Sequence, residues 1–142
     1  MLNSTDFGKI GEVRFLYELT SRGIQVSIPY GNSARYDMIA DFNGKLNRIQ
    51  IKTTSQFNDN KTSAIVKCTS YTTRLNGVAA SYVDDVDYIG VFIPEWDQVL
   101  LIPISIIGNA QTFSIRKEKN DKLGGPKPHY LEDFVLDKII LN

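Results

Sequence analysis

Two apolar-rich runs, Tyr36–Phe42 and Leu46–Thr53, flank the dipeptide Asn43-Gly44. Asn-Gly readily adopts the positive φ angles of a type I′ turn, which is a common two-residue connection between antiparallel strands. The two runs are therefore predicted to form a β-hairpin with a tight turn. Because such a turn also sets which residues of the strands face each other, this stretch constrains the fold more than any other.

The predicted register brings three polar side chains together. A two-residue turn places Phe42 opposite Lys45, and the same register places Asp37 opposite Gln50. Side chains alternate between the faces of a strand, so Lys52 shares the face of Gln50 and lies diagonal to Asp37. A carboxylate and an amide oxygen suit Mg²⁺, and a nearby lysine can orient a water or neutralise developing charge. A solvated hairpin face is the alternative interpretation.

A helix is predicted near the start of the chain, with Thr5 or Asp6 as its N-cap. It ends near Arg22, and Gly23 has the residue type expected just beyond a helix C-terminus. Charges repeat every four residues on one side of this helix, at Arg14, Glu18 and Arg22. This charged stripe is expected to face water.

The opposite side of the helix combines apolar residues with a carboxylate. The apolar residues are Phe15, Leu16 and Leu19. Glu12 points the same way, and a carboxylate directed toward a core is costly without a partner. Gly8 and Gly11 each weaken a helix by about 1 kcal/mol relative to alanine, which a closely approaching backbone or substrate would explain. Alternatively, Glu12 lies at the helix edge and reaches water or a lysine.

Further strands are predicted at Ile24–Tyr30, Thr62–Thr69, Tyr88–Ile93 and Val99–Ile104. The last two are continuous apolar runs, which indicates strands that are covered on both faces. The segment Tyr130–Leu141 is expected to be a short helix or strand. The whole pattern predicts a single domain over residues 1–142 of the α/β (α+β) class, with a mixed β-sheet and flanking helices.

The composition excludes several kinds of site. A single cysteine, Cys68, and a single histidine, His129, leave no intramolecular disulfide and make a Cys/His zinc site implausible. No stretch resembles a signal peptide or a membrane span of about 20 apolar residues, so we expect a cytoplasmic protein with no membrane partner. The formal net charge is zero, which gives no overall attraction to nucleic acid.

The charges are nevertheless unevenly distributed. No lysine or arginine occurs between Arg74 and Arg116, and the region from Arg116 onward is basic. Its cations are Arg116, Lys117, Lys119, Lys122 and Lys127. This cluster is consistent with a phosphate-binding face and equally with a solvated loop.

Three short motifs together resemble the PD-(D/E)XK nuclease superfamily. They are Gly8-Lys9-Ile10-Gly11-Glu12, Tyr36-Asp37 and Gln50-Ile51-Lys52. Among its branches, the chain is most similar to the Holliday junction resolvases and the group I intron-encoded homing endonucleases. The resemblance covers about residues 7–54 and implies a restriction-endonuclease-like core. Gln50 departs from the usual Asp or Glu but is similar to the glutamine of the intron-encoded enzymes, and Tyr36 replaces a proline that commonly varies.

The resemblance implies roles for five residues. Glu12, Asp37, Gln50 and Lys52 are the expected catalytic residues. The expected ligands of Mg²⁺ (or Mn²⁺) are Asp37, Gln50, Glu12 and the main-chain carbonyl of Ile51. Lys52 is expected to contact the attacked phosphate or the water. Because Gln50 removes one negative charge, weaker metal binding or a catalytically inactive module is also consistent with the motif.

The expected partner is double-stranded or branched DNA. Candidate phosphate contacts are Arg35, Arg48, Lys61, Lys67, Arg74, Arg116, Lys117, Lys119 and Lys127. Candidate base contacts are Tyr71, Asn76 and His129, while the segment Tyr71–Asp85 fits a loop or a weak helix. Cutting both strands requires two active sites, so a homo-oligomer (dimer or tetramer) is expected, with Tyr88–Ile104 as its candidate interface.

The leading hypothesis is a Mg²⁺-dependent DNA endonuclease that hydrolyses phosphodiester bonds at specific sites, as homing and restriction enzymes do. A Holliday junction resolvase would use the same chemistry on branched DNA. A catalytically inactive DNA-binding module would bind DNA without cutting it. A plain interaction domain would do neither, and Glu12 would then be structural.

Overall fold

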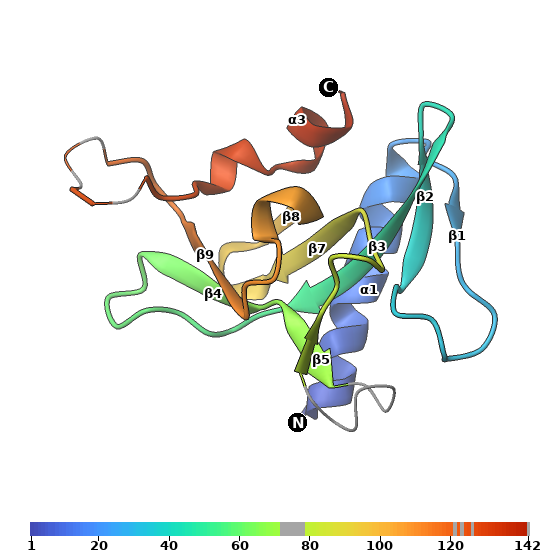
Figure 1. The fold of residues 1–142 in the computed structure, drawn as a ribbon, viewed down its shortest axis with the longest axis horizontal. Helices are drawn as coiled ribbons and strands as arrows, with labels where there is room; N and C mark the ends of the chain where they lie inside the picture. The colour runs from blue at the N-terminus through green and yellow to red at the C-terminus, as the bar shows by residue number, and fades with distance from the viewer. Residues whose placement is uncertain (72–78, 121, 123, 126, 142) are drawn as a thin grey trace.

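The computed structural model describes residues 1–71, 79–120, 122, 124–125 and 127–141, and Figure 1 shows its fold. The helices are α1 (Ser4–Ser21), α2 (Ile104–Ile107) and α3 (Leu136–Ile140), with 3-10 turns η2 (Pro94–Trp96) and η3 (Leu131–Asp133). The strands are β1 (Val26–Ser27), β2 (Met38–Phe42), β3 (Lys45–Thr53), β4 (Ser63–Lys67), β5 (Thr69–Tyr71), β6 (Ala79–Ser81), β7 (Tyr88–Ile93), β8 (Gln98–Pro103) and β9 (Thr112–Arg116).

The central sheet has five strands in the order β1-β2-β3-β7-β8. Strand β3 pairs with β7 in parallel, and the other neighbours pair antiparallel. Strands β4 and β9 form a separate two-stranded sheet, and so do β5 and β6. The mixed sheet with flanking helices that the sequence predicts is therefore confirmed.

The hairpin β2–β3 has the predicted register. Phe42 pairs with Lys45, and the ladder continues to the pair of Met38 and Ile49. Asn43 and Gly44 adopt φ angles of 57° and 91°, as a type I′ turn requires. The turn residues thus determine the alignment of the whole hairpin.

Helix α1 differs from the prediction at its start and agrees with it at its end. Its N-cap is Asn3, whose side chain accepts a hydrogen bond from the N–H of Asp6, while Asp6 accepts one from the N–H of Asn3. This capping box stabilises the helix start and leaves Thr5 inside the helix. Gly23 follows with φ of 75°, in the left-handed region that glycine favours.

The predicted charged stripe of α1 is present. Glu18 accepts hydrogen bonds from Arg14 at 3.4 Å and from Arg22 at 3.1 Å. Leu16, however, is 41% exposed, whereas Phe15 and Leu19 are fully buried. The helix contacts β3 and β7 over a face narrower than the sequence suggests, so Leu16 lies at its edge.

Two apolar cores lie on opposite faces of the central sheet. The helix-side core comprises Phe15, Leu19, Met38, Ala40, Ile49, Ile51, Phe92, Val99, Leu101 and Leu136. The outer core comprises Ala64, Val66, Cys68, Tyr82, Val86, Ile89, Val91, Ile93, Leu100, Ile102, Ile107, Phe113, Ile115 and Phe134. Strands β7 and β8 contribute alternate residues to both cores, which confirms that they are covered on both faces. Most of these side chains are buried within the chain, and the subunit interface suggested for Tyr88–Ile104 stays a prediction.

Three predicted strands differ from the observed ones. The segment Ile24–Tyr30 pairs only at Val26–Ser27, and the segment Thr62–Thr69 contains β4, which pairs with β9 outside the central sheet. Ile104 begins α2 after Pro103 instead of extending β8. The terminal segment forms η3 and α3, so it is helical.

Within the described residues, none of the helices combines the length and apolar character needed to cross a lipid bilayer.

Gly11 lies where α1 comes closest to β3. A Cβ atom at this position would collide with Oγ1 of Thr53 and would lie 3.4 Å from Cγ2 of Ile51. A Cβ atom at Gly8 would meet nothing within 4 Å. The close approach of another part of the chain therefore occurs at Gly11, and no described protein atom makes one at Gly8.

These two glycines provide a matched pair of substitutions. Gly8→Ala is expected to raise the free energy of unfolding by about 0.5–1 kcal/mol, because alanine favours the helix and the space is open. Gly11→Ala is expected to lower it by about 1–3 kcal/mol, because the added methyl group displaces α1 from β3. Urea unfolding measures both, and equal effects of the two substitutions would contradict the close approach.

Candidate active site

Asp37 lies directly before β2 and is held by two hydrogen bonds to β3. Its N–H donates to the carbonyl of Ile49 at 2.9 Å, and its Oδ2 accepts from the N–H of Ile51 at 2.7 Å. The carboxylate therefore occupies the place where the next pair of the hairpin ladder would form. This pairing fixes the carboxylate beside the segment 50–52.

The backbone of Ile51 faces the same place. The N–H and C=O groups of one residue in a strand point to the same side, and the N–H of Ile51 points to Asp37. The carbonyl oxygen is therefore directed to the edge of β3 that β2 no longer covers. This arrangement is compatible with the predicted use of that carbonyl as a metal ligand.

Glu12 approaches Asp37 from α1. Burial, the negative charge of Asp37 and a hydrogen bond with Asp37 raise the pKa of Glu12, and the positive charge of Lys9 opposes them. The adjacent Gly11 allows this approach, because the helix backbone lies against Thr53 and Ile51 there. The structure thus brings together two carboxyl groups that are 25 residues apart in the sequence (37 − 12).

Gln50 and Lys52 occupy the face of β3 opposite the helix-side core. Ile49 and Ile51 are buried beneath α1, whereas Gln50 and Lys52 are half-buried. The ammonium of Lys52 donates a hydrogen bond to the hydroxyl of Tyr82 at 3.2 Å and lies 5.0 Å from the centre of its ring. None of the ion pairs among the described residues involves Lys52, and its hydrogen-bond partner there, Tyr82, is a neutral phenol.

The donor set at this edge consists of oxygen atoms. Among the described residues, no three Cys, His, Asp or Glu side chains gather closely enough to hold a metal ion by themselves. The donors that the contacts bring together are the carboxylates of Glu12 and Asp37 and the backbone of Ile51, and Gln50 is the preceding residue of β3. Hard oxygen donors of this kind fit Mg²⁺ or Mn²⁺, which retain some of their waters. Burial and then the negative charge of Asp37 raise the pKa of Glu12, and a cation between the two carboxylates would offset that repulsion.

Two arginines that were predicted to contact phosphates are bound within the chain. Arg35 forms an ion pair with Asp85 at 2.7 Å and stacks on Tyr82, with its guanidinium carbon 4.4 Å from the ring centre. Arg48 lies 3.7 Å from the carboxylate of Asp87. Since the side chain of Arg35 is also only 16% exposed, most of it is occupied by contacts within this region.

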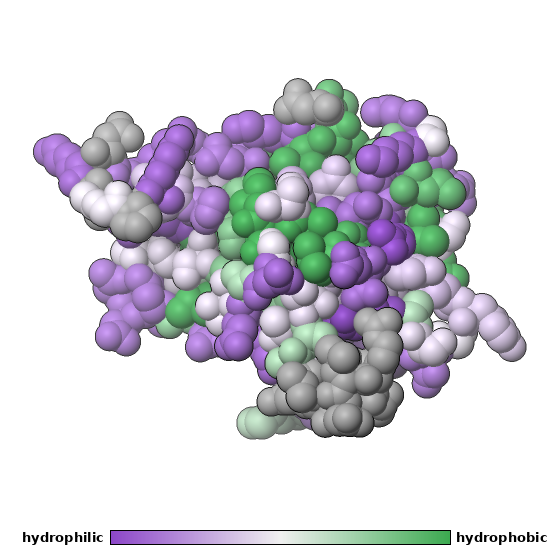
Figure 2. Space-filling view, viewed as in Figure 1, coloured by the Kyte–Doolittle hydropathy of each residue, from purple (hydrophilic) through white to green (hydrophobic). Residues whose placement is uncertain are grey.

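Other predicted cations gather at one end of the molecule, here called the basic end and defined as Lys61, Arg116, Lys117, Lys119 and Lys127. Lys61, Arg116 and Lys117 line a cavity of about 180 Å³, and Lys119 and Lys127 line another of about 400 Å³. Figure 2 shows many hydrophilic side chains at this end, around β4 and β9 of Figure 1. Two of the lysines form ion pairs, Lys61 with Glu95 and Lys119 with Glu132.

The remaining predicted contact residues have different positions. Lys67 lines a cavity of about 240 Å³ together with Lys52. His129 is exposed and its ring centre lies 4.5 Å from that of Phe113. Arg74, Asn76 and the side chain of Tyr71 lie outside the described residues.

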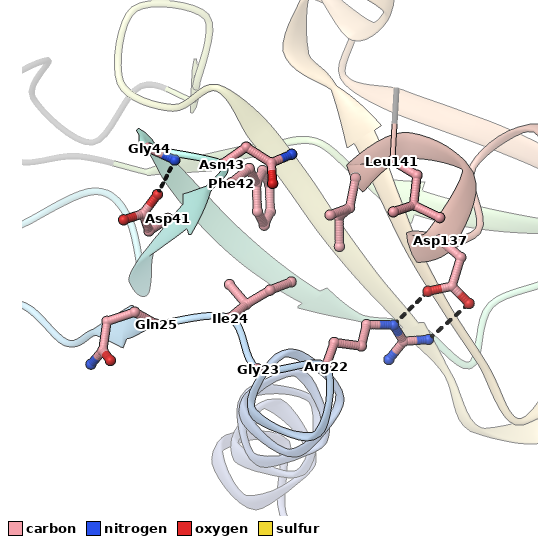
Figure 3. A pocket seen from close by; sticks show the side chains of 11 residues that line it. Arg22, Gly23, Ile24, Gln25, Asp41, Phe42, Asn43, Gly44, Asp137 and Leu141 are labelled. Carbon is pink, nitrogen blue, oxygen red and sulfur yellow. Dashed lines mark hydrogen bonds and ion pairs between the residues drawn. The ribbon is translucent and has the colours of Figure 1, made fainter.

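A larger cavity lies away from the candidate site. It has a volume of about 590 Å³ and is formed by the end of α1, the turn of the hairpin and α3 (Figure 3). Arg22 and Asp137 form an ion pair at its wall, and Asp41 accepts a hydrogen bond from Gly44 in the turn. None of the predicted catalytic residues lines this cavity.

Sequence reasoning missed Tyr82 and its connection to Lys52. The two residues are 30 positions apart, and they meet because β3 and the segment after β6 both border the outer core. No local pattern around Tyr82 signals this contact. Only the pairing of the strands reveals it.

The family model described as PD-(D/E)XK endonuclease matches residues 2–137. A solved structure of a bacterial homing endonuclease, I-Ssp6803I, superposes with a TM-score of 0.77 at 17% sequence identity. The match covers 99% of this chain and 93% of that chain. No match was found among curated proteins.

The raised pKa of Glu12 predicts a change of stability with pH. Between its unfolded value and the raised folded value, the unfolded chain loses the Glu12 proton first, so rising pH destabilises the folded state. Glu12→Gln removes this effect and is expected to stabilise the protein at pH 7 by at most about 0.5–1 kcal/mol, because solvent screens a partly exposed carboxylate. The gain should disappear below the unfolded pKa, where Glu12 is protonated in both states.

Urea unfolding of wild type and Glu12→Gln at pH 4 and pH 7 measures this difference. Glu18→Gln is the matched control on the same helix, because Glu18 is paired with Arg14 and Arg22. That control is expected to lower stability at pH 7 instead of raising it. A Glu12→Gln protein that is less stable than wild type at pH 7 would contradict the prediction.

Proposed function

Because the chain belongs to the PD-(D/E)XK endonuclease family, we propose that it is a metal-dependent endonuclease that cuts double-stranded DNA at a specific sequence. The observation that carries this proposal is the meeting of Glu12 and Asp37 beside the segment 50–52. Sequence specificity is proposed because the structural neighbour is a homing endonuclease and the fold match spans nearly the whole chain.

Glu12, Asp37, Gln50 and the carbonyl of Ile51 would hold the metal ion, Mg²⁺ or Mn²⁺. When bound, such an ion stabilises negative charge on the phosphoryl and leaving oxygens and lowers the pKa of the attacking water. The hydrogen bond from the N–H of Ile51 orients the Asp37 carboxylate before any ligand arrives. The neutral Gln50 gives the site one negative charge fewer than an acidic residue would, and its amide is able to position a water.

Lys52 acts on the phosphate. Its ammonium has no carboxylate partner among the described residues, so its full charge is available to the phosphoryl oxygens. A cation placed where negative charge develops lowers the barrier by stabilising the transition state more than the ground state. We assign Lys52 this electrostatic role together with orientation of the attacking water.

We assign DNA binding to Lys52 and Lys67, which line one cavity, and to the basic end. Phosphate contacts position a duplex, whereas base contacts give sequence specificity. One subunit supplies one candidate site, so cutting both strands requires a homo-oligomer. The protein is therefore proposed to act as a dimer or tetramer.

Gel analysis of DNA cleavage tests the function. Purified protein is incubated with plasmid DNA carrying candidate target sites and with a synthetic four-way junction, each with Mg²⁺, with Mn²⁺ or with EDTA. Discrete metal-dependent products from linear sites would support the proposal. Symmetric cuts confined to the junction would indicate a resolvase, and DNA binding without any cut would indicate an inactive module.

Lys52→Ala is expected to slow cleavage at least about 100-fold while DNA affinity stays within about threefold of wild type. The loss is catalytic because a single phosphate contact contributes little to the affinity of a whole interface. Single-turnover rates and binding titrations in EDTA separate the two effects. Lys45→Ala, at the exposed hairpin turn, is the control and should cleave normally. Full activity of Lys52→Ala would refute the role.

Removing cations from the basic end is expected to lower the affinity for DNA and to make that affinity less dependent on the salt concentration. Each lost phosphate contact lowers the slope of log affinity against log salt by about 0.9. The double substitution Lys117→Gln and Lys127→Gln should therefore reduce the slope by about 2. Lys45→Gln, beside the turn of the hairpin, serves as the control, and Figure 1 shows this turn away from β4 and β9. An unchanged slope would exclude the basic end from the interface.

A further inference from the structure

A lysine at an active site needs to be held in place. Its side chain has four rotatable carbon–carbon bonds and loses about 2 kcal/mol of conformational free energy when it is fixed. In the described part of the chain, Lys52 is not fixed by an ion pair. Its partner is the phenol of Tyr82, a neutral group that receives a hydrogen bond without neutralising the charge.

Tyr82 makes two kinds of contact with Lys52. Its hydroxyl oxygen accepts a hydrogen bond from Nζ at 3.2 Å, and the centre of its ring lies 5.0 Å from Nζ. Ring faces attract cations because their quadrupole is negative there. Tyr82 itself is only 3% exposed and is part of the outer core, so it is a rigid support.

Arg35 holds the ring of Tyr82 in turn. The guanidinium carbon lies 4.4 Å from the ring centre. Arg35 also donates to the carbonyl of Ser81 at 2.9 Å, to the hydroxyl of Ser70 at 3.1 Å and to the carboxylate of Asp85 at 2.7 Å. These bonds connect β5, β6 and the segment after β6, so the position of Tyr82 is determined from several sides.

We propose that Tyr82 is a positioning residue for Lys52, which rests on the proposed nuclease function. Its hydroxyl and ring restrict the ammonium to the volume that the attacked phosphate enters, and Arg35 fixes the ring. Tyr82 does not touch the reacting atoms. Its effect is on the rate of the chemical step and not on the affinity for DNA.

The main test is Tyr82→Phe, which removes the hydroxyl and keeps the ring. The variant loses the hydrogen bond between the Lys52 ammonium and the Tyr82 hydroxyl. We therefore expect a single-turnover cleavage rate about 3–10-fold lower, with DNA affinity in EDTA unchanged. Tyr130→Phe is a matched control, because Tyr130 is also buried and has a lysine, Lys119, 5.8 Å from its ring centre. A Tyr82→Phe rate equal to that of wild type and of Tyr130→Phe would overturn the proposal.

A second measurement requires no activity. In protein labelled with ¹³C-lysine, the ε-CH₂ signal of Lys52, assigned by its loss in Lys52→Arg, should be shifted by the aromatic ring away from the signals of exposed lysines. Tyr82→Leu should return it to the exposed position. A Lys52 signal that already coincides with the exposed lysines in wild type would overturn the proposal. If the wild type cuts no DNA, the proposed nuclease function has failed, and this signal still decides whether Tyr82 holds Lys52.

Discussion

The close contact between α1 and β3 at Gly11 determines the geometry of the candidate site. The helix approaches the strand so closely that a Cβ atom at residue 11 would collide with Thr53. Glu12 is the next residue, so the same contact places its carboxyl group beside Asp37. The hairpin supplies the other half of this geometry, because its turn sets the register of Asp37 against β3. The contact at Gly11 thus brings α1 and the hairpin β2–β3 together at the candidate site.

Charged side chains with a structural role differ from those of the candidate site in their partners. Arg14, Arg22 and Arg35 have carboxylate partners within the chain. At the candidate site, two carboxyl groups lie together and a lysine has a neutral partner instead. Like charges held together destabilise the folded protein, and such local cost is common where a ligand is to be bound.

Much of this arrangement could be predicted from local sequence. Asn43 and Gly44 specify a turn, and the turn specifies the register from the pair Phe42–Lys45 to the pair Met38–Ile49, which brings Asp37 beside β3. The apolar runs of β7 and β8 indicate their burial on both faces. Tertiary pairing was not predictable, because the sequence does not reveal that β4 pairs with β9 instead of joining the central sheet. For the same reason, the predicted phosphate contact of Arg35 overlooked its internal partners, which are 35–50 positions away along the chain.

The parallel pairing of β3 with β7 has a consequence for the order of folding. The hairpin needs only local contacts and can form within about 1–10 μs. Strand β3 pairs with β7 only after the ends of the intervening segment 54–87 have come together, which is a slower, long-range step. Glu12, Asp37, Gln50 and Lys52 all precede that segment, but Tyr82 lies within it and the buried strands β7 and β8 follow it. A nascent chain therefore carries every candidate catalytic side chain before it can hold them in place. Assembly of the site depends on the slow, long-range step of folding.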